Sequence, residues 1–124
     1  MPYPTGRTLY YIDAAHLRDA SLSDDQLAKR IQVVGKTGAA DGILCDDRGR
    51  IYLSSLESDS INVTDDQGNV QTLVKHQGIS WPDTFAWGSQ EGGKRWLYFT
   101  TSRIQEGDQP TQPYGLHRIA VPMK

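Results

Sequence analysis

The feature that most constrains the fold is a unit of about 40 to 50 residues that occurs twice along the chain. In the first copy, Asp41 precedes two β-prone runs that an Asp/Gly turn separates, within residues 42–55. In the second copy, Asp83 precedes two similar runs within residues 84–101, around a turn at 89–95. A repeat of this kind predicts stacked supersecondary units that bury their apolar faces against one another.

The spacing of the two copies favours the blades of a β-propeller. Asp41 and Asp83 are 42 positions apart. Tyr52 and Tyr98, which lie in the second runs, are 46 positions apart because the second turn is four residues longer. A four-stranded propeller blade takes roughly this number of residues. Between the copies, residues 60–74 alternate apolar and polar side chains on both sides of an Asp-Asp-Gln-Gly-Asn turn, which predicts the hairpin that completes the first blade.

Three segments follow from this pattern. Residues 1–38 are expected to form the outer half of a blade, with one short helix near 23–31 that begins at a Ser-x-x-Gln capping box. Residues 39–78 are expected to form a complete blade, and residues 79–124 a three-stranded last blade. The strands expected outside the two copies are 8–12, 32–34 and 116–121. The predicted fold class is therefore all-β, a partial propeller of about two to two and a half four-stranded antiparallel blades.

These units are too few for a closed ring, because propellers typically have four to eight blades. We therefore expect either that the chain is the C-terminal part of a longer protein or that several copies assemble. Head-to-tail copies close into a ring only if the rotation per subunit divides the circle. The chain is thus predicted to need upstream blades or self-association.

Composition excludes two classes of partner. Lys and Arg number 13 against 15 Asp and Glu, so the formal net charge is −2, and the basic residues are scattered rather than gathered in a stripe. Nucleic acid is therefore not an expected partner. No apolar run approaches the roughly 18 residues of a membrane span, and the first residues lack the profile of a secretory signal. The single cysteine, Cys45, is expected to be buried in a strand.

Several stretches carry a family resemblance. They are Leu17-Arg18-Asp19, Leu22-Ser23-Asp24, Ala40-Asp41-Gly42, Ile51-Tyr52-Leu53 with Leu56-Glu57, Ser80-Trp81-Pro82-Asp83-Thr84-Phe85-Ala86, and Pro113-Tyr114-Gly115-Leu116-His117-Arg118-Ile119. Together they resemble the C-terminal part of the yellow and major royal jelly protein family in its bacterial branch, and the Trp-Pro-Asp-Thr-Phe stretch is the most specific. The resemblance covers residues 9–121. It implies the last two to three blades of a six-bladed propeller, related to the gluconolactonase-like superfamily.

This resemblance also implies a place for the site and a location for the protein. The family's ligand site lies in the central cavity at one end of the propeller axis, and insect members are secreted, so an extracellular or periplasmic location is expected. In the related lactonases, an Asp-Gly pair before an inner strand binds a divalent cation. Asp41, which Gly42 follows, is therefore a candidate ligand for a cation such as Ca²⁺. Ca²⁺ takes six to eight oxygens, so other blades would supply the rest.

The candidate ligand-binding residues are Asp41, Trp81, Asp83 and Thr84. Trp81 would lie near the mouth of the cavity, where an aromatic ring can stack on an aromatic or cationic ligand. Thr84 follows Asp83 where the lactonase pattern has Gly. Structural alternatives stay open: each Asp caps backbone amides where the strand begins, Trp81 is wedged between blades, and residues 57–59 form a solvated loop.

Three functions remain in view. The first is binding of a small molecule at the axial cavity, without turnover by this segment alone. The second is a metal-dependent, lactonase-like hydrolase half-site built on Asp41, and the third is a truncated fragment without function. Residues of a complete catalytic constellation are not recognised, and whether the protein is an enzyme is left open.

Overall fold

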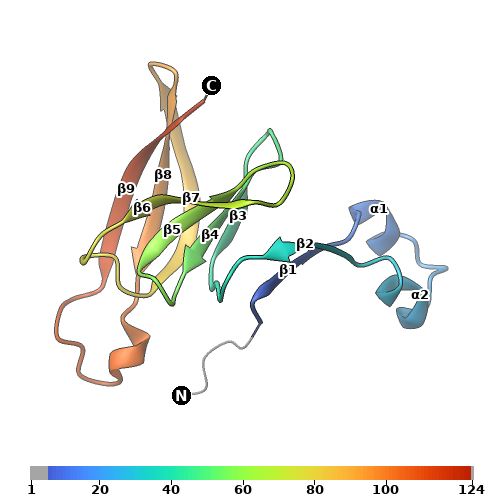
Figure 1. Ribbon diagram of the computed structural model, residues 1–124, viewed down its shortest axis with the longest axis horizontal. Coiled ribbons are helices and arrows are strands. Elements are labelled where there is room, and N and C mark those ends of the chain that lie inside the picture. The colour runs from blue at the N-terminus through green and yellow to red at the C-terminus, as the bar shows by residue number, and fades with distance from the viewer. Residues whose placement is uncertain (1–5, 124) are drawn as a thin grey trace.

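The computed structural model describes residues 6–123 and confirms the all-β class. Within this range, nine strands form three separate antiparallel sheets of two, four and three strands. The sheets are arranged like successive blades of a partial propeller, with two short helices beside the first sheet (Figure 1). Among the described residues, no helix has the length and apolar character needed to cross a membrane.

The first sheet pairs β1 (Thr8–Tyr11) with β2 (Gln32–Lys36), and α1 (Ala14–Leu17) and α2 (Asp24–Ala28) lie between these strands in sequence. The predicted capping box forms at the start of α2, because Gln26 N donates to Ser23 Oγ at 3.4 Å and Ser23 N donates to Gln26 Oε1 at 2.8 Å. The expected end at residue 31 was wrong. Ile31 lies beyond the helix and is 50% exposed, so no buried apolar contact at this residue favours a longer helix.

Helix α1 was not expected from the sequence. It is only four residues long, too short to show a helical period. Its start is fixed by Asp13, whose Oδ1 accepts a hydrogen bond of 2.7 Å from Ala15 N. The single predicted helix is therefore replaced by two short ones.

The second sheet contains β3 (Ile43–Cys45), β4 (Ile51–Ser55), β5 (Ser60–Thr64) and β6 (Val70–Lys75), hydrogen-bonded in chain order. Both predicted Asp/Gly turns are present. In each, the first aspartate, Asp46 or Asp65, accepts hydrogen bonds from the amides two and four residues further on, at 2.8 to 3.0 Å. Gly49 and Gly68 supply the left-handed φ of 78° and 80° that ends each turn.

The third sheet contains β7 (Pro82–Glu91), β8 (Lys94–Thr101) and β9 (Gly115–Pro122), again in chain order. A short 3-10 helix, η1 (Ile104–Glu106), lies in the loop before β9. The turn expected at 89–95 is much shorter. Gly92 and Gly93, with φ of 56° and 74°, make the whole connection, because two residues with positive φ suit a tight hairpin.

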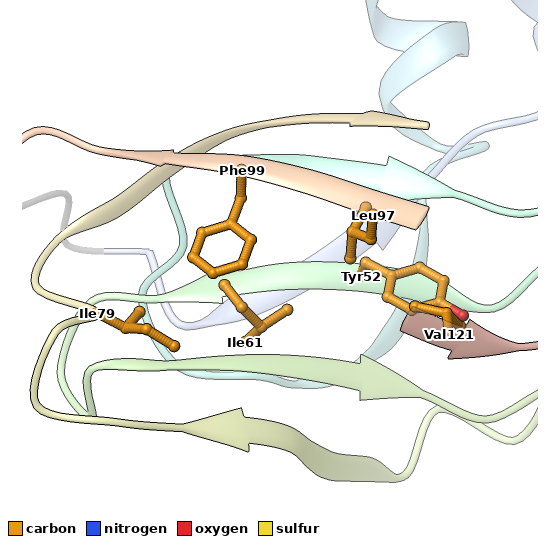
Figure 2. Packing of buried hydrophobic residues seen from close by; sticks show 6 residues of the cluster. All are labelled: Tyr52, Ile61, Ile79, Leu97, Phe99 and Val121. Atoms are coloured by element: carbon orange, nitrogen blue, oxygen red, sulfur yellow. The ribbon is translucent and has the colours of Figure 1, made fainter. Parts of the chain in front are cut away.

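The core lies between the second and third sheets. Its six buried members come from both sheets and from the segment that connects them, and Figure 2 shows their side chains meeting between the strands: Tyr52, Ile61, Ile79, Leu97, Phe99 and Val121. The ring of Tyr52 meets the ring of Trp87 edge-on, with 5.0 Å between centroids. These contacts hold the two repeat copies side by side.

The first sheet covers the second sheet less completely than the third sheet does. A cavity of about 470 Å³ opens beside the first sheet, lined among others by Tyr11, Val33 and Ile51. Cys45 borders this cavity and is exposed, so the prediction of a buried cysteine was wrong. The reason is positional, because Cys45 and Ile43 alternate with Leu44 and share the face of β3 that lies away from the core cluster.

Candidate functional site

The predicted site residues lie at the end of the sheets where β3 and β7 begin. Asp41 lies two residues before β3, and Trp81 directly precedes β7. Asp83 and Thr84 are the second and third residues of β7. These positions come together because the first strands of the second and third sheets start at the same end, side by side.

The backbones of the two first strands approach very closely at this end. A Cβ built on Gly42 would lie 1.7 Å from the carbonyl oxygen of Asp83. Real Cβ atoms never come this near to another atom, so only glycine fits here. The Asp-Gly pair thus has a packing reason at its second residue, whatever ligand its first residue meets.

Asp41 links the two sheets through its side chain. Its Oδ2 accepts a hydrogen bond of 3.0 Å from the indole Nε1 of Trp81. The amides of Asp41 and Gly42 instead donate to the hydroxyl of Ser54 in β4, at 2.9 and 2.7 Å. The capping of backbone amides that the sequence suggested for Asp41 is therefore performed by Ser54, a residue that sequence reasoning did not single out.

Trp81 is 6% exposed, and its backbone has φ of 48°. This left-handed conformation costs about 1 to 3 kcal/mol for a bulky residue, so the surrounding contacts must hold it. One of them is the hydrogen bond of 3.1 Å that Ser102 N donates to the Trp81 carbonyl. The position between the sheets agrees with the wedge alternative, and a ligand at this end would meet a small part of the ring.

Asp83 is half-buried, and Thr84 beside it is exposed. Thr84 Oγ1 donates to Asp83 Oδ1 at 3.3 Å, and Thr84 N donates to Thr100 Oγ1 at 3.2 Å. The second contact repeats the one between Gly42 and Ser54, since residues 84 and 100 are the equivalents of 42 and 54 in the second copy. The hydroxyl caps are thus a shared feature of both blades.

An ion pair that the sequence did not predict lies at the same end. Arg7 donates to Glu57 through Nε and Nη2, with a shortest distance of 2.6 Å. The hydrogen bonds from Arg7 lower the pKa of Glu57 below its usual value. A small cavity of about 230 Å³ is lined by these two residues with Ala39 and Leu56. The segment 57–59, expected to be a solvated loop, is therefore fixed at its first residue.

A chain of hydroxyl groups runs behind this end of the second sheet. Ser58 Oγ lies 2.7 Å from both Ser55 Oγ and Ser60 Oγ, and Ser60 Oγ donates to Asn62 Oδ1 at 3.2 Å. Ser55, Ser60 and Asn62 are buried. These polar groups form hydrogen bonds with one another, so the network has a structural role within the second sheet.

The donor set at Asp41 does not by itself fit a bound Ca²⁺. Within residues 6–123, no group of three or more His, Cys, Asp or Glu side chains is placed to hold a metal ion. One oxygen of Asp41 is already bonded to the Trp81 indole. Since Ca²⁺ takes six to eight oxygens, most of its ligands would have to come from outside these residues.

Chemically, this end of the sheets offers two carboxylates at equivalent positions, a buried indole that joins the strands, and an exposed hydroxyl. Such a set suits the recognition of a cationic group by charge and hydrogen bonding. Asp41 remains exposed and Asp83 half-buried, so both carboxylates are within reach of solvent. Comparison of the chain with protein-family models gives no match, and comparison with curated proteins gives none either.

Proposed function

We propose that the chain is the C-terminal segment of a propeller of the yellow and major royal jelly type, and that it binds a small molecule without turnover of its own. The ligand lies at the end of the axial cavity lined by Asp41, Trp81, Asp83 and Thr84. In this proposal further blades complete the ring, and the protein works in an extracellular or periplasmic setting, as the family resemblance implies.

The observation that carries the proposal is the pairing of two repeat-equivalent aspartates at adjoining strand starts, with the Trp81 indole bonded to Asp41 at 3.0 Å. The backbone carbonyl of Asp83 lies against Gly42, so Asp83 is directly beside the residue that follows Asp41. Two carboxylates within reach of solvent attract a protonated amine. Trp81 is the aromatic member of the candidate site, and its ring favours a ligand that also carries an aromatic part.

The test uses tyramine, which joins a phenol ring to an ammonium group, and 4-ethylphenol, which keeps the ring and lacks the charge. Calorimetry is expected to give heat with tyramine, and tryptophan fluorescence is expected to change, while 4-ethylphenol binds far more weakly. Replacing Asp83 by Asn should weaken tyramine binding by about tenfold, which is about 1.4 kcal/mol. Asp66→Asn, in an exposed turn at the opposite end, is the matched control and should leave binding unchanged.

Two results would contradict this proposal. Neither heat nor a fluorescence change with tyramine would remove the ligand class, and equal binding of 4-ethylphenol would remove the role of the carboxylates. A rise of the melting temperature with Ca²⁺, Mn²⁺ or Zn²⁺, together with lactone hydrolysis that Asp41→Asn abolishes, would instead favour the metal-dependent hydrolase.

A further inference from the structure

The two repeat copies can be superposed residue by residue through their strand registers. In the second sheet Ile43 pairs with Leu53, and in the third sheet Phe85 pairs with Phe99. Positions in the first strand are therefore offset by 42, and positions in the second strand by 46, as the sequence spacing requires. Each position of β3 and β4 that contacts the third sheet thus has a defined equivalent on the third sheet's own outer face.

Three of the contacts between these two sheets involve a tryptophan. Asp41 Oδ2 accepts from Trp81 Nε1 at 3.0 Å, and the carbonyl of Cys45 accepts from Trp87 Nε1 at 3.0 Å. The ring of Tyr52 meets the ring of Trp87 edge-on at 5.0 Å. All three are made to a pair of tryptophans six positions apart, and buried tryptophans commonly dominate the energetics of an interface.

The outer face of the third sheet carries the equivalents of the three receiving positions. Asp83 corresponds to Asp41, Trp87 with its carbonyl corresponds to Cys45, and Tyr98 corresponds to Tyr52. Around Tyr98 the face is apolar and shallowly hollowed, and Leu116 on it is 73% exposed. Leu116 and the hollow around Tyr98 therefore give this face exposed apolar surface that a neighbouring sheet would bury.

We propose that this face, defined by Asp83, Tyr98 and Leu116, is the docking surface for a further antiparallel β-blade that brings a tryptophan pair at the spacing of Trp81 and Trp87. The first indole donates to Asp83, and the second places its ring edge-on to Tyr98. The contact therefore continues the interface already present between the second and third sheets, one step further along the row.

A second copy of the chain does not meet this requirement. Trp81 is 6% exposed, and Trp87 is engaged with Tyr52 and Cys45, so both members of the pair are committed within their own chain. The first sheet, which lies at the other end of the row, contains no tryptophan in its strands. The blade that docks here comes from a polypeptide segment other than residues 6–123.

The strand register supplies a direct experiment. Asn62 pairs with Leu53 and His117 with Phe99, so β9 is the equivalent of β5 with an offset of 55 positions. A second copy of residues 68–124 fused after Pro122 therefore gives the third sheet an outer strand and adds a fourth sheet with its own tryptophan pair. The full chain is retained in front of this extension.

We expect the extended chain to melt about 5 °C or more above the parent chain, since the added sheet buries apolar surface that the parent chain exposes. Hydroxyl-radical footprinting should show severalfold lower modification at Leu116 in the extended chain. Asp83→Asn and Tyr98→Ala should lower the melting temperature of the extended chain by several degrees more than that of the parent. Asp41→Asn, the matched control, should lower both alike.

The opposite results overturn the proposal. They are an extended chain that aggregates or melts no higher than the parent, or one in which Leu116 stays as reactive as before. A parent chain that forms a dimer in sedimentation experiments, which Leu116→Ser dissociates, would show that a second copy covers this face instead. Since none of these readouts uses an amine ligand, failure here leaves the tyramine experiment as an independent test of the proposed function.

Discussion

Replacement of Gly42 by alanine is the sharpest test of how the two repeat copies meet. The added Cβ would lie 1.7 Å from the carbonyl oxygen of Asp83, whereas ordinary contacts begin near 3.4 Å. The first strands of the two sheets would therefore have to separate by about 1.7 Å at this point. The atom that blocks the Cβ is backbone, so no side-chain rotation relieves the clash.

Overpacking of a close-packed interior costs 1 to 3 kcal/mol in most cases, and a backbone clash belongs at the upper end of that range. We expect Gly42→Ala to lower the free energy of unfolding by about 3 kcal/mol, or the melting temperature by about 10 to 15 °C. The separation should also stretch the hydrogen bond between Asp41 and Trp81. Urea denaturation followed by tryptophan fluorescence measures both effects.

Gly6→Ala is the matched control, because a Cβ at Gly6 meets nothing within 4 Å. It should be neutral or stabilising by up to about 1 kcal/mol, since alanine restricts the unfolded chain. If Gly42→Ala costs less than about 1 kcal/mol relative to this control, the two strands do not approach as the structure has them. Packing against the Asp83 carbonyl would then not explain the glycine after Asp41.

Three further perturbations have defined outcomes. Ser54→Ala should cost about 2 kcal/mol in urea denaturation, because the amides of Asp41 and Gly42 lose their acceptor, while an unchanged midpoint would contradict that role. Burial raises the pKa of Asp46, but the hydrogen bonds from Arg50 and nearby amides outweigh it and hold this pKa below its usual 3.8. The stabilisation by Asp46 should be complete above about pH 4 and be lost as the pH falls through the lowered pKa. In Asp46→Asn, this fall of the melting temperature with falling pH should be absent. Burial raises the pKa of Tyr52 to about 12, so one phenol should ionise late in an alkaline absorbance titration. The stability from Tyr52 should be complete below its unfolded pKa near 10 and disappear toward pH 12, and a titration identical in Tyr52→Phe would refute the assignment.

Local patterns in the sequence were sufficient for most of the fold. Alternation of apolar and polar residues located the strand 60–64 and all but the last residue of the strand 70–75, and the Asp/Gly signals located both turns of the second sheet, because strand faces and tight turns depend on neighbours a few residues away. The capping box likewise located the start of α2. The repeat spacing then indicated the order of sheets, since equivalent segments form equivalent structures.

The candidate site depended on contacts that no local pattern encodes. The bond between Asp41 and Trp81 joins residues 40 positions apart, and Ser54 takes over the capping role expected of Asp41 from another strand. Exposure of Cys45 was equally hidden, because it depends on how far the first sheet covers the second. Local sequence patterns are thus sufficient to assign the strands and their repetition. Which side chains meet depends on the tertiary structure, because burial and hydrogen bonding between sheets depend on the packing of segments distant in the chain.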